Sequence, residues 1–102
     1  MSDDLLETCH ECAEHCERCE RICDEDREEL ARICIDCAQL CWLISFYISR
    51  QSPHVLALTE LAARLCDECA DECTQYDDDE CQDCAETCRQ SAAQFARILT
   101  FG

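Results

Sequence analysis

The sequence predicts an all-α fold: an antiparallel up-down-up-down four-helix bundle with a cysteine-lined core. Two observations predict it. The 102 residues include one Gly and one Pro, too few for the turns that a β or α/β fold needs. Fourteen residues are cysteine, and within each segment they recur in steps of three and four, the spacing of one helix face. A chain of this length builds one core, so we expect residues 1–102 to form a single bundle.

The cysteines follow one pattern, C-x-x-C-x-x-x-C, in four separate segments. The first segment, CHECAEHCERCERIC, holds the pattern twice in overlap, and the others read CIDCAQLC, CDECADEC and CQDCAETC. This spacing confines the cysteines of a segment to an arc of about 80° on a helix, with charged residues on the solvated face. Four such stripes predict four helices around a sulfur-lined centre. The cysteines are Cys9, Cys12, Cys16, Cys19, Cys23, Cys34, Cys37, Cys41, Cys66, Cys69, Cys73, Cys81, Cys84 and Cys88.

Helix boundaries are set by the few start signals in the chain. The acidic run Asp24–Asp26 is expected to form the first turn and to cap the second helix. Ser52 followed by Pro53 is typical of an N-cap with Pro at the first helical position, which starts the third helix. Connections this short require antiparallel neighbours. The expected helices cover residues 3–23, 26–50, 53–74 and 78–100.

The two ends of the predicted core differ. The stripes continue at one end as apolar residues, which predicts a hydrophobic plug: Leu5, Ile44, Ile48, Val55, Leu58, Ala62, Phe95 and Leu99. The opposite end, under the two acidic turns, holds Cys23, Cys73 and Cys81 with Leu30. We therefore expect a tube of thiols that is plugged at one end and has a cysteine mouth at the other.

Charge and hydropathy limit the kinds of partner that the chain can bind and indicate its cellular location. Twenty-four Asp and Glu residues oppose eight basic residues, all Arg, for a formal net charge of −16. Such a surface repels nucleic acid and anionic membranes. The apolar stretch Leu40–Ile48 is too short to span a bilayer, and Met1–Glu7 has no secretory character. We expect a cytoplasmic protein with reduced thiols, without nucleic-acid or membrane partners.

Soft thiolates favour Cu(I), zinc or iron-sulfur clusters. Cu(I) accepts two or three thiolates, and cysteines at i and i+4 can bridge one ion without a loop. Buried thiols must be protonated when empty, so each entering Cu(I) displaces protons, and electroneutrality favours about one metal per sulfur, or roughly 10 to 14 Cu(I) per chain. The i, i+4 pairs are Cys12–Cys16, Cys19–Cys23, Cys37–Cys41, Cys69–Cys73 and Cys84–Cys88.

Four helices that each carry an inward C-x-x-C-x-x-x-C stripe, within about a hundred residues, resemble the copper storage proteins. The resemblance covers essentially the whole chain. It implies a four-helix bundle that stores many Cu(I) ions along its axis, and it implies assembly as a homotetramer. The missing export signal makes the chain similar to the cytosolic members of that family.

Other readings of the cysteines remain open at this point. Helical hairpins stapled by disulfides would also use cysteine pairs on helix faces, and structural zinc or an iron-sulfur cluster would use the same ligands. His10 and His15 flank the first stripe and are candidate auxiliary metal ligands. The chain contains no Ser-His-Asp set and no Gly-rich phosphate loop, so we expect no enzymatic activity.

One apolar surface is not explained by the stripes. In the second helix, Trp42, Leu43, Phe46 and Tyr47 surround the core positions, so this half of the helix is apolar nearly all round. A patch of this kind marks an interaction surface. We predict that these four residues form an interface between copies of the chain.

Overall fold

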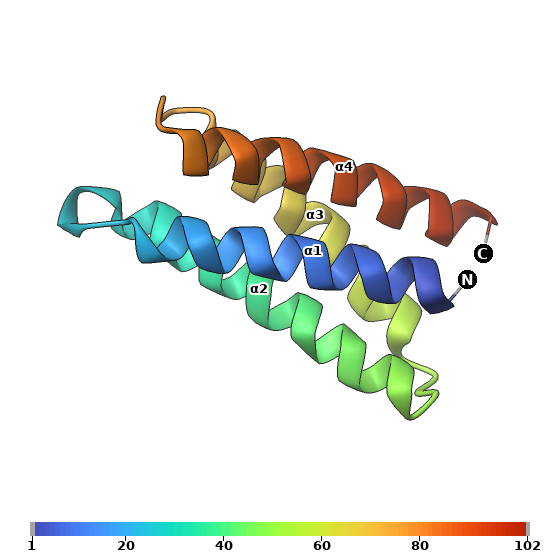
Figure 1. Ribbon diagram of the computed structural model, residues 1–102. Coiled ribbons are helices and arrows are strands. Elements are labelled where there is room, and N and C mark those ends of the chain that lie inside the picture. The colour runs from blue at the N-terminus through green and yellow to red at the C-terminus, as the bar shows by residue number, and fades with distance from the viewer. Residues whose placement is uncertain (1, 102) are drawn as a thin grey trace.

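The computed structural model describes residues 2–101 as four α-helices that run alternately up and down (Figure 1). Helix α1 contacts α2 and α4, and α3 contacts the same two helices. Both termini and the α2–α3 connection lie at one end, and the other two connections lie at the opposite end (Figure 1). Residues 2–101 contain no β-strand, so the predicted fold class is confirmed. The elements are α1 (Ser2–Arg21), η1 (Glu25–Arg27), α2 (Glu28–Ser49), α3 (Val55–Cys73) and α4 (Asp79–Phe101).

Helix α1 ends two residues earlier than the expected boundary, so Cys23 lies in the turn. The last amides bond to carbonyls three residues back, from Cys23 N to Glu20 O at 3.0 Å, which tightens the final turn. The Asp24 carboxylate then accepts a hydrogen bond from the amide of Asp26 at 3.0 Å. The acidic run therefore caps the short helix η1, which leads directly into α2.

The α2–α3 connection also differs in detail from the expectation. The Ser52 hydroxyl accepts a hydrogen bond from the His54 amide at 3.1 Å, and α3 begins at Val55 rather than at Pro53. Helix α2 ends with paired bonds from Gln51 N to Ile48 O and from Ser52 N to Tyr47 O, each 3.0 Å. These two bonds form a Schellman cap, and they place Gln51 in the left-handed region at φ 53°.

The core consists of thiols in the middle and apolar side chains at one end. Thirteen of the fourteen cysteines are buried, and Cys23 is half-buried. In the expected plug, Leu5, Ile44 and Phe95 are fully buried. The α4 stripe ends on Ile98, which is buried, rather than on Leu99, which is half-buried. Ile98 follows Phe95 by three residues and stays on the inward face. Leu99 follows by four residues and lies farther from that face.

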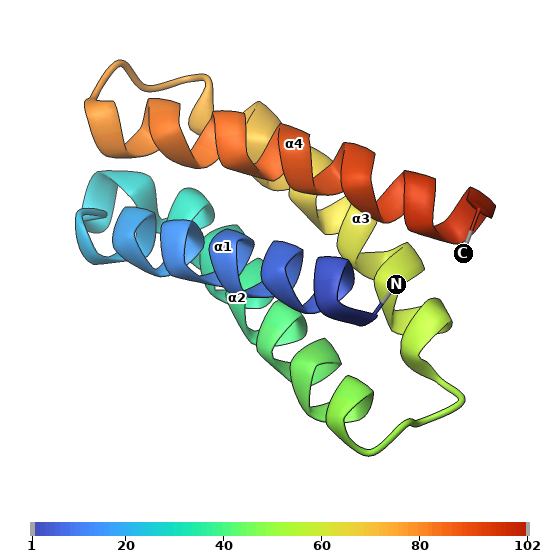
Figure 2. The same ribbon diagram turned by 45° about the vertical axis from the view of Figure 1, so that its right-hand side comes forward.

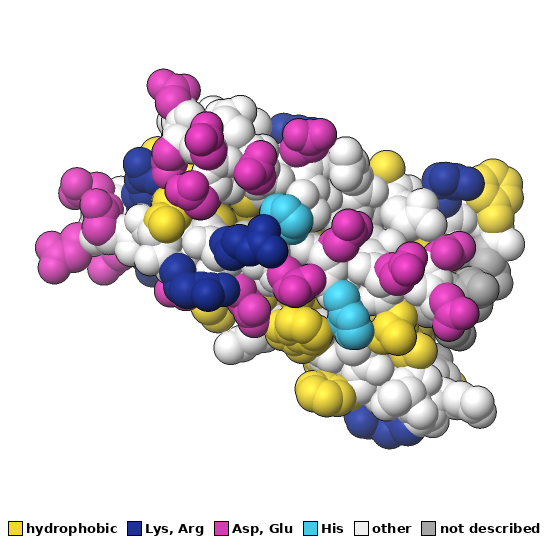
Figure 3. Space-filling model, in the orientation of Figure 1, with side chains coloured by type: hydrophobic (Ala, Val, Ile, Leu, Met, Phe, Trp, Pro, Cys, Tyr) yellow, Lys and Arg dark blue, Asp and Glu magenta, His cyan; other side chains and the backbone are white. Residues whose placement is uncertain are grey.

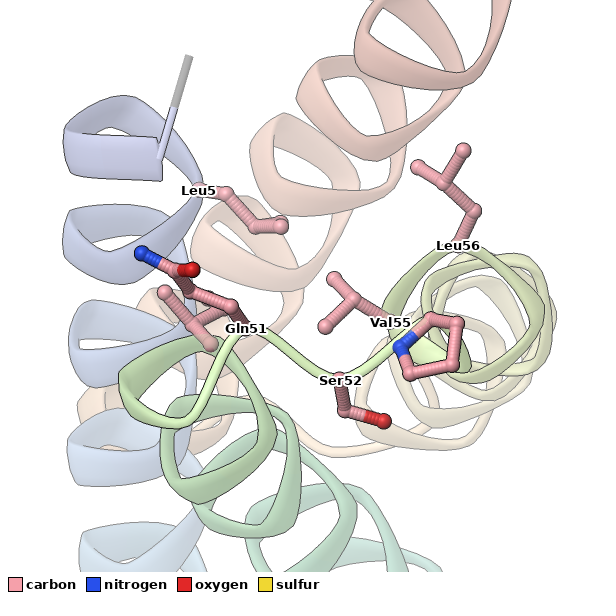
Figure 4. A pocket seen from close by; sticks show the side chains of 7 residues that line it. Leu5, Gln51, Ser52, Val55 and Leu56 are labelled. Atoms are coloured by element: carbon pink, nitrogen blue, oxygen red, sulfur yellow. The ribbon is translucent and has the colours of Figure 1, made fainter.

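The plug end is less tightly closed than the thiol region. The α2–α3 connection diverges from α4 there (Figure 2). A hollow of about 410 Å³ lies between α1, α2 and α3, and Leu5 and Val55 point toward one another across it (Figure 4). Phe95 lies fully buried at this end. The hollow is lined by Leu5, Ile48, Gln51, Ser52, Pro53, Val55 and Leu56.

Acidic side chains cover much of the visible face and gather at the end that carries the α1–α2 connection (Figure 3). Among the described residues, one segment, Glu25–Ser49, is long and apolar enough by composition to cross a membrane. In the bundle the cysteine-bearing face of α2 is buried, and a single such segment is found among the described residues. This segment is therefore weak evidence for a membrane span.

Candidate metal centre

Three groups of four buried cysteines lie along the bundle axis, each with its sulfur atoms within 4.8 Å of one another. Each group takes cysteines from at least three helices, because every stripe faces the same axis. The groups overlap: Cys88 belongs to two and Cys84 belongs to two, so together they hold ten different cysteines. They are the plug-side group (Cys12, Cys37, Cys66 and Cys88), the middle group (Cys16, Cys69, Cys84 and Cys88) and the mouth-side group (Cys19, Cys34, Cys73 and Cys84).

The sulfur contacts run mainly between helices rather than along them. Cys12 Sγ lies 3.4 Å from Cys66 Sγ and 3.7 Å from Cys37 Sγ, which joins α1 to α3 and α2. Of the five expected i, i+4 pairs, Cys84–Cys88 makes a thiol–thiol contact, at 3.9 Å. The Cys23 thiol, in the turn after α1, instead donates to Cys19 O at 3.2 Å. Four converging stripes therefore create shared sites between helices.

All fourteen cysteines are free thiols. The shortest contact between two sulfurs, 3.4 Å for Cys12 and Cys66, is far longer than the roughly 2.05 Å of a disulfide bond. Separations of 3.4 to 3.9 Å match those between ligands that share one metal ion, since four sulfurs about 2.3 Å from a zinc ion lie nearly 3.8 Å apart. The disulfide-stapled interpretation therefore finds no support in this geometry.

Burial favours the protonated form of several of these thiols. Desolvation raises the pKa of Cys81 from 9.0 to about 11 and raises the pKa of Cys23. The pKa of Cys66 is raised by its contacts with the thiols of Cys12 and Cys37 and by burial. At neutral pH these groups are neutral thiols, so a metal ion that binds them must release protons.

The mouth of the tube is formed by three residues of the two connections and by Cys81 in the first turn of α4. Arg27 Nη1 donates to both carboxylate oxygens of Asp78, at 3.0 and 2.9 Å, and to Cys81 Sγ at 3.5 Å. The guanidinium lies 4.4 Å from the centre of the Tyr76 ring. Its hydrogen bonds hold the pKa of Asp78 below the usual range. Sequence reasoning missed this arrangement because Arg27 and Asp78 are 51 residues apart and belong to no periodic pattern.

The candidate auxiliary ligands lie beside the thiols. The His10 ring packs on Trp42 with 5.1 Å between ring centroids, and His15 Nδ1 bonds to Glu11 O at 3.0 Å. Neither histidine is part of a cysteine group within the described part of the chain. Both side chains are half-buried, and each contacts a helix residue other than a cysteine.

The predicted interface residues divide into two kinds. Phe46 is 62% exposed and Leu43 is 38% exposed, so both present apolar surface. Trp42 is partly covered by α1, because its indole nitrogen donates to Glu17 Oε2 at 2.8 Å and its ring contacts His10. Tyr47 is half-buried, and the Arg50 guanidinium lies 4.3 Å from its ring centre.

Comparison with known proteins decides the family. The model of the family described as "Copper storage protein" matches residues 1–100. The chain belongs to the copper storage protein family. A cysteine-rich Bacillus subtilis (strain 168) relative, YhjQ, described as uncharacterized, is 31% identical over 104 residues, which span 90% of this chain and 96% of the relative. The resemblance found in the repeated motif is thus confirmed.

Solved structures of this family share the fold closely. The Cu(I)-bound copper storage protein BsCsp3 superposes with a TM-score of 0.89 at 27% identity, over 96% of this chain and 97% of that protein. The apo form of copper storage protein 3 from Bacillus subtilis has a TM-score of 0.90 at 30% identity, over 97% of this chain and 99% of that protein. The similarity therefore extends over the entire bundle.

Proposed function

We propose that this chain stores multiple Cu(I) ions on thiolates that line the bundle axis. The observation that carries the proposal is the overlap of the three cysteine groups, which form one continuous ladder of sulfurs. Membership of the copper storage protein family and the Cu(I)-bound state of BsCsp3 support it. All fourteen cysteines serve as ligands, with Cys9 and Cys41 extending the ladder toward the plug and Cys23 and Cys81 extending it toward the mouth.

Overlap favours Cu(I) over zinc. Zinc prefers four ligands that belong to it alone, and the middle group shares a cysteine with each of its neighbours. Two closed zinc sites can therefore exist at once, and most of the remaining thiols would be unused. Cu(I) accepts two or three thiolates, so shared sulfurs bridge successive ions, and one metal per thiolate keeps the buried core neutral.

Native mass spectrometry tests the proposal directly. Reduced protein is loaded without oxygen with excess Cu(I) or, in a parallel sample, Zn²⁺, and is then desalted. We expect roughly 10 to 14 Cu(I) per chain, as electroneutrality requires, and no more than two tightly held Zn²⁺. A limit of one or two copper ions, or equal numbers of both metals, would contradict storage.

We also propose that copies of the chain associate through α2 as a homotetramer, the state that the family resemblance implies. The exposed rings and side chains of Leu43 and Phe46 support this, with Trp42 and Tyr47 at the edge of the same face. Sedimentation should show a tetramer, and Phe46→Glu should dissociate it. Phe101→Glu is the matched control, because Phe101 is 85% exposed at the end of α4 and lies outside this face. A monomeric wild-type chain would overturn the assignment.

The role we propose is that of a non-catalytic store in the cytoplasm. Fourteen free thiols in one core suit a reducing compartment, since oxidation would remove the ligands. In this proposal the cysteines act as metal ligands. We propose no reaction for the chain and no nucleic-acid or membrane partner. Thiol counting on protein isolated directly from cells checks this: substantial oxidation would contradict a cytoplasmic store.

A further inference from the structure

The mouth of the tube is covered by an ion pair between the two connections. Arg27 ends η1, in the α1–α2 connection, and Asp78 directly precedes α4. One guanidinium nitrogen bonds to both oxygens of Asp78, at 3.0 and 2.9 Å, and the planar group lies 4.4 Å from the centre of the Tyr76 ring. The Arg27 and Asp78 side chains are 26% and 33% exposed, so the pair is partly shielded from water.

This ion pair also touches the thiols. Arg27 Nη1 donates to Cys81 Sγ at 3.5 Å, and the Cys81 thiol is 3.7 Å from Asp78 Oδ2. Cys81 Sγ in turn lies 3.8 Å from Cys19 Sγ, a member of the mouth-side group. Arg27 and Asp78 thus contact a sulfur at the mouth from which a path continues into the ladder.

The other ion pairs of the described residues lie elsewhere. Arg89 and Asp71 join α3 to α4 at 3.0 Å on the outer surface, with side chains 51% and 73% exposed. The pair of Arg32 and Glu28 lies one turn apart on α2 at 3.9 Å. Within residues 2–101, Arg27 and Asp78 therefore form the ion pair that bridges the two connections and contacts a cysteine.

Copper must pass one end of the bundle to reach thirteen buried cysteines. At the plug end the fully buried rings and side chains of Phe95, Leu5 and Ile44 separate the thiols from solvent. At the mouth, Arg27 and Asp78 cover Cys81. An ion that binds Cys81 there needs the sulfur to be released by both of these side chains.

We propose that the Arg27–Asp78 pair, seated on Tyr76, is a latch that sets the rate at which Cu(I) enters and leaves through Cys81. This inference rests on the proposed storage function and deepens it. When the latch is open, the bond from Cu(I) to the donor's ligand breaks, a bond to Cys81 Sγ forms, and the thiol proton passes to the buffer. The latch controls rates and leaves the number of ions at equilibrium unchanged.

The decisive variant is Asp78→Asn, with Arg27→Ala beside it and Arg89→Ala as the control. Arg27→Ala and Arg89→Ala make the same change in net charge, but the latter lies on the outer surface. Transfer of Cu(I) from a coloured cuprous chelator is followed by stopped flow. Opening a latch of about 1 kcal/mol accelerates transfer about fivefold in both mouth variants, while Arg89→Ala stays within a factor of two.

Asp78→Asn separates a latch from simple charge steering. If the acidic mouth merely attracted the cation, loss of the Asp78 charge would slow entry, whereas a latch predicts faster entry. Slower or unchanged transfer in Asp78→Asn overturns the proposal. This variant keeps the shape of the side chain, so it carries the test even where Arg27→Ala is poorly folded.

A second measurement uses the empty protein and needs no copper. Pulsed alkylation with peptide mass spectrometry gives the labelling rate of each cysteine. We expect Arg27→Ala to raise the labelling of Cys81 about fivefold relative to wild type and to leave buried Cys66 unchanged. Because loss of the guanidinium disfavours the reactive thiolate, faster labelling in this variant reports access. Equal Cys81 labelling in the two proteins would refute the latch. A wild-type chain that binds no copper, while Cys81 labelling still rises, would refute storage alone.

Discussion

Cys88 is the residue whose removal best distinguishes a copper ladder from separate zinc sites. Its sulfur belongs to both the plug-side and the middle group, and it lies 3.6 Å from Cys16 Sγ and 3.9 Å from Cys84 Sγ. Cys88→Ala leaves each of these two groups with three thiols. Three thiolates still suffice for Cu(I), whereas a closed zinc site needs four.

The geometry sets how much zinc capacity and how much copper capacity Cys88→Ala should lose. Intact protein can hold two zinc ions in groups that share no cysteine, the plug-side and mouth-side groups. Cys88→Ala leaves one complete group, so zinc capacity is halved. Copper capacity, at about one ion per thiolate, falls by about one ion of the roughly 10 to 14 expected. Alanine adds no polar atom to the dry core, so the loss of stability is about 1 kcal/mol.

Both capacities are measured by native mass spectrometry on the same protein preparations. Cys23→Ala is the matched control, because Cys23 is half-buried and lies outside the three groups. This control should lose about one Cu(I) and no zinc. The reasoning is refuted if Cys88→Ala loses half of its copper, or if its zinc capacity equals that of Cys23→Ala.

Three further predictions concern the stability of the bundle. Phe95→Ala removes a fully buried ring and should lower the free energy of unfolding, measured by urea titration, by about 3 to 5 kcal/mol. Copper capacity should be retained. A small loss of stability would mean that the plug is not packed. Gln51→Gly should stabilise the chain by about 1 kcal/mol, because φ is 53° at this position. The control Gln90→Gly, at an exposed helical position, should instead destabilise the chain by about 1 kcal/mol. Equal effects of the two substitutions would exclude a left-handed cap. Stability should fall as pH rises from 9 to 11, because the Cys81 thiol loses its proton at 9.0 when unfolded and at about 11 when folded. Chemical denaturation across that pH range should show a shallower fall in Cys81→Ala, and identical slopes would contradict the shift.

The helices and their inward faces could be predicted from the sequence because they depend on local spacing. Steps of three and four residues leave one possible face for each cysteine stripe, so the burial of Cys12, Cys66 and Cys84 followed directly. The same spacing did not resolve the last turn of α4, where Ile98 and Leu99 both lie near the edge of the stripe.

Contacts between distant residues could not be predicted in this way. The sharing of Cys88 by two groups depends on the axial stagger of four helices, which no spacing within one helix reports. The Arg27–Asp78 pair depends on how two connections meet at one end. The helical spacing correctly placed Trp42 away from the cysteine stripe of α2. It could not show that the His10 ring and the Glu17 carboxylate of α1 cover Trp42.

An anaerobic Cu(I) titration of fully reduced protein against a competing cuprous chelator, with free thiols counted at each step, tests the central claim most directly. The ladder predicts uptake of roughly ten or more Cu(I) per chain, with the reactive thiols disappearing in step until nearly all fourteen cysteines are protected. Saturation at one or two ions, with most thiols still reactive, would contradict it.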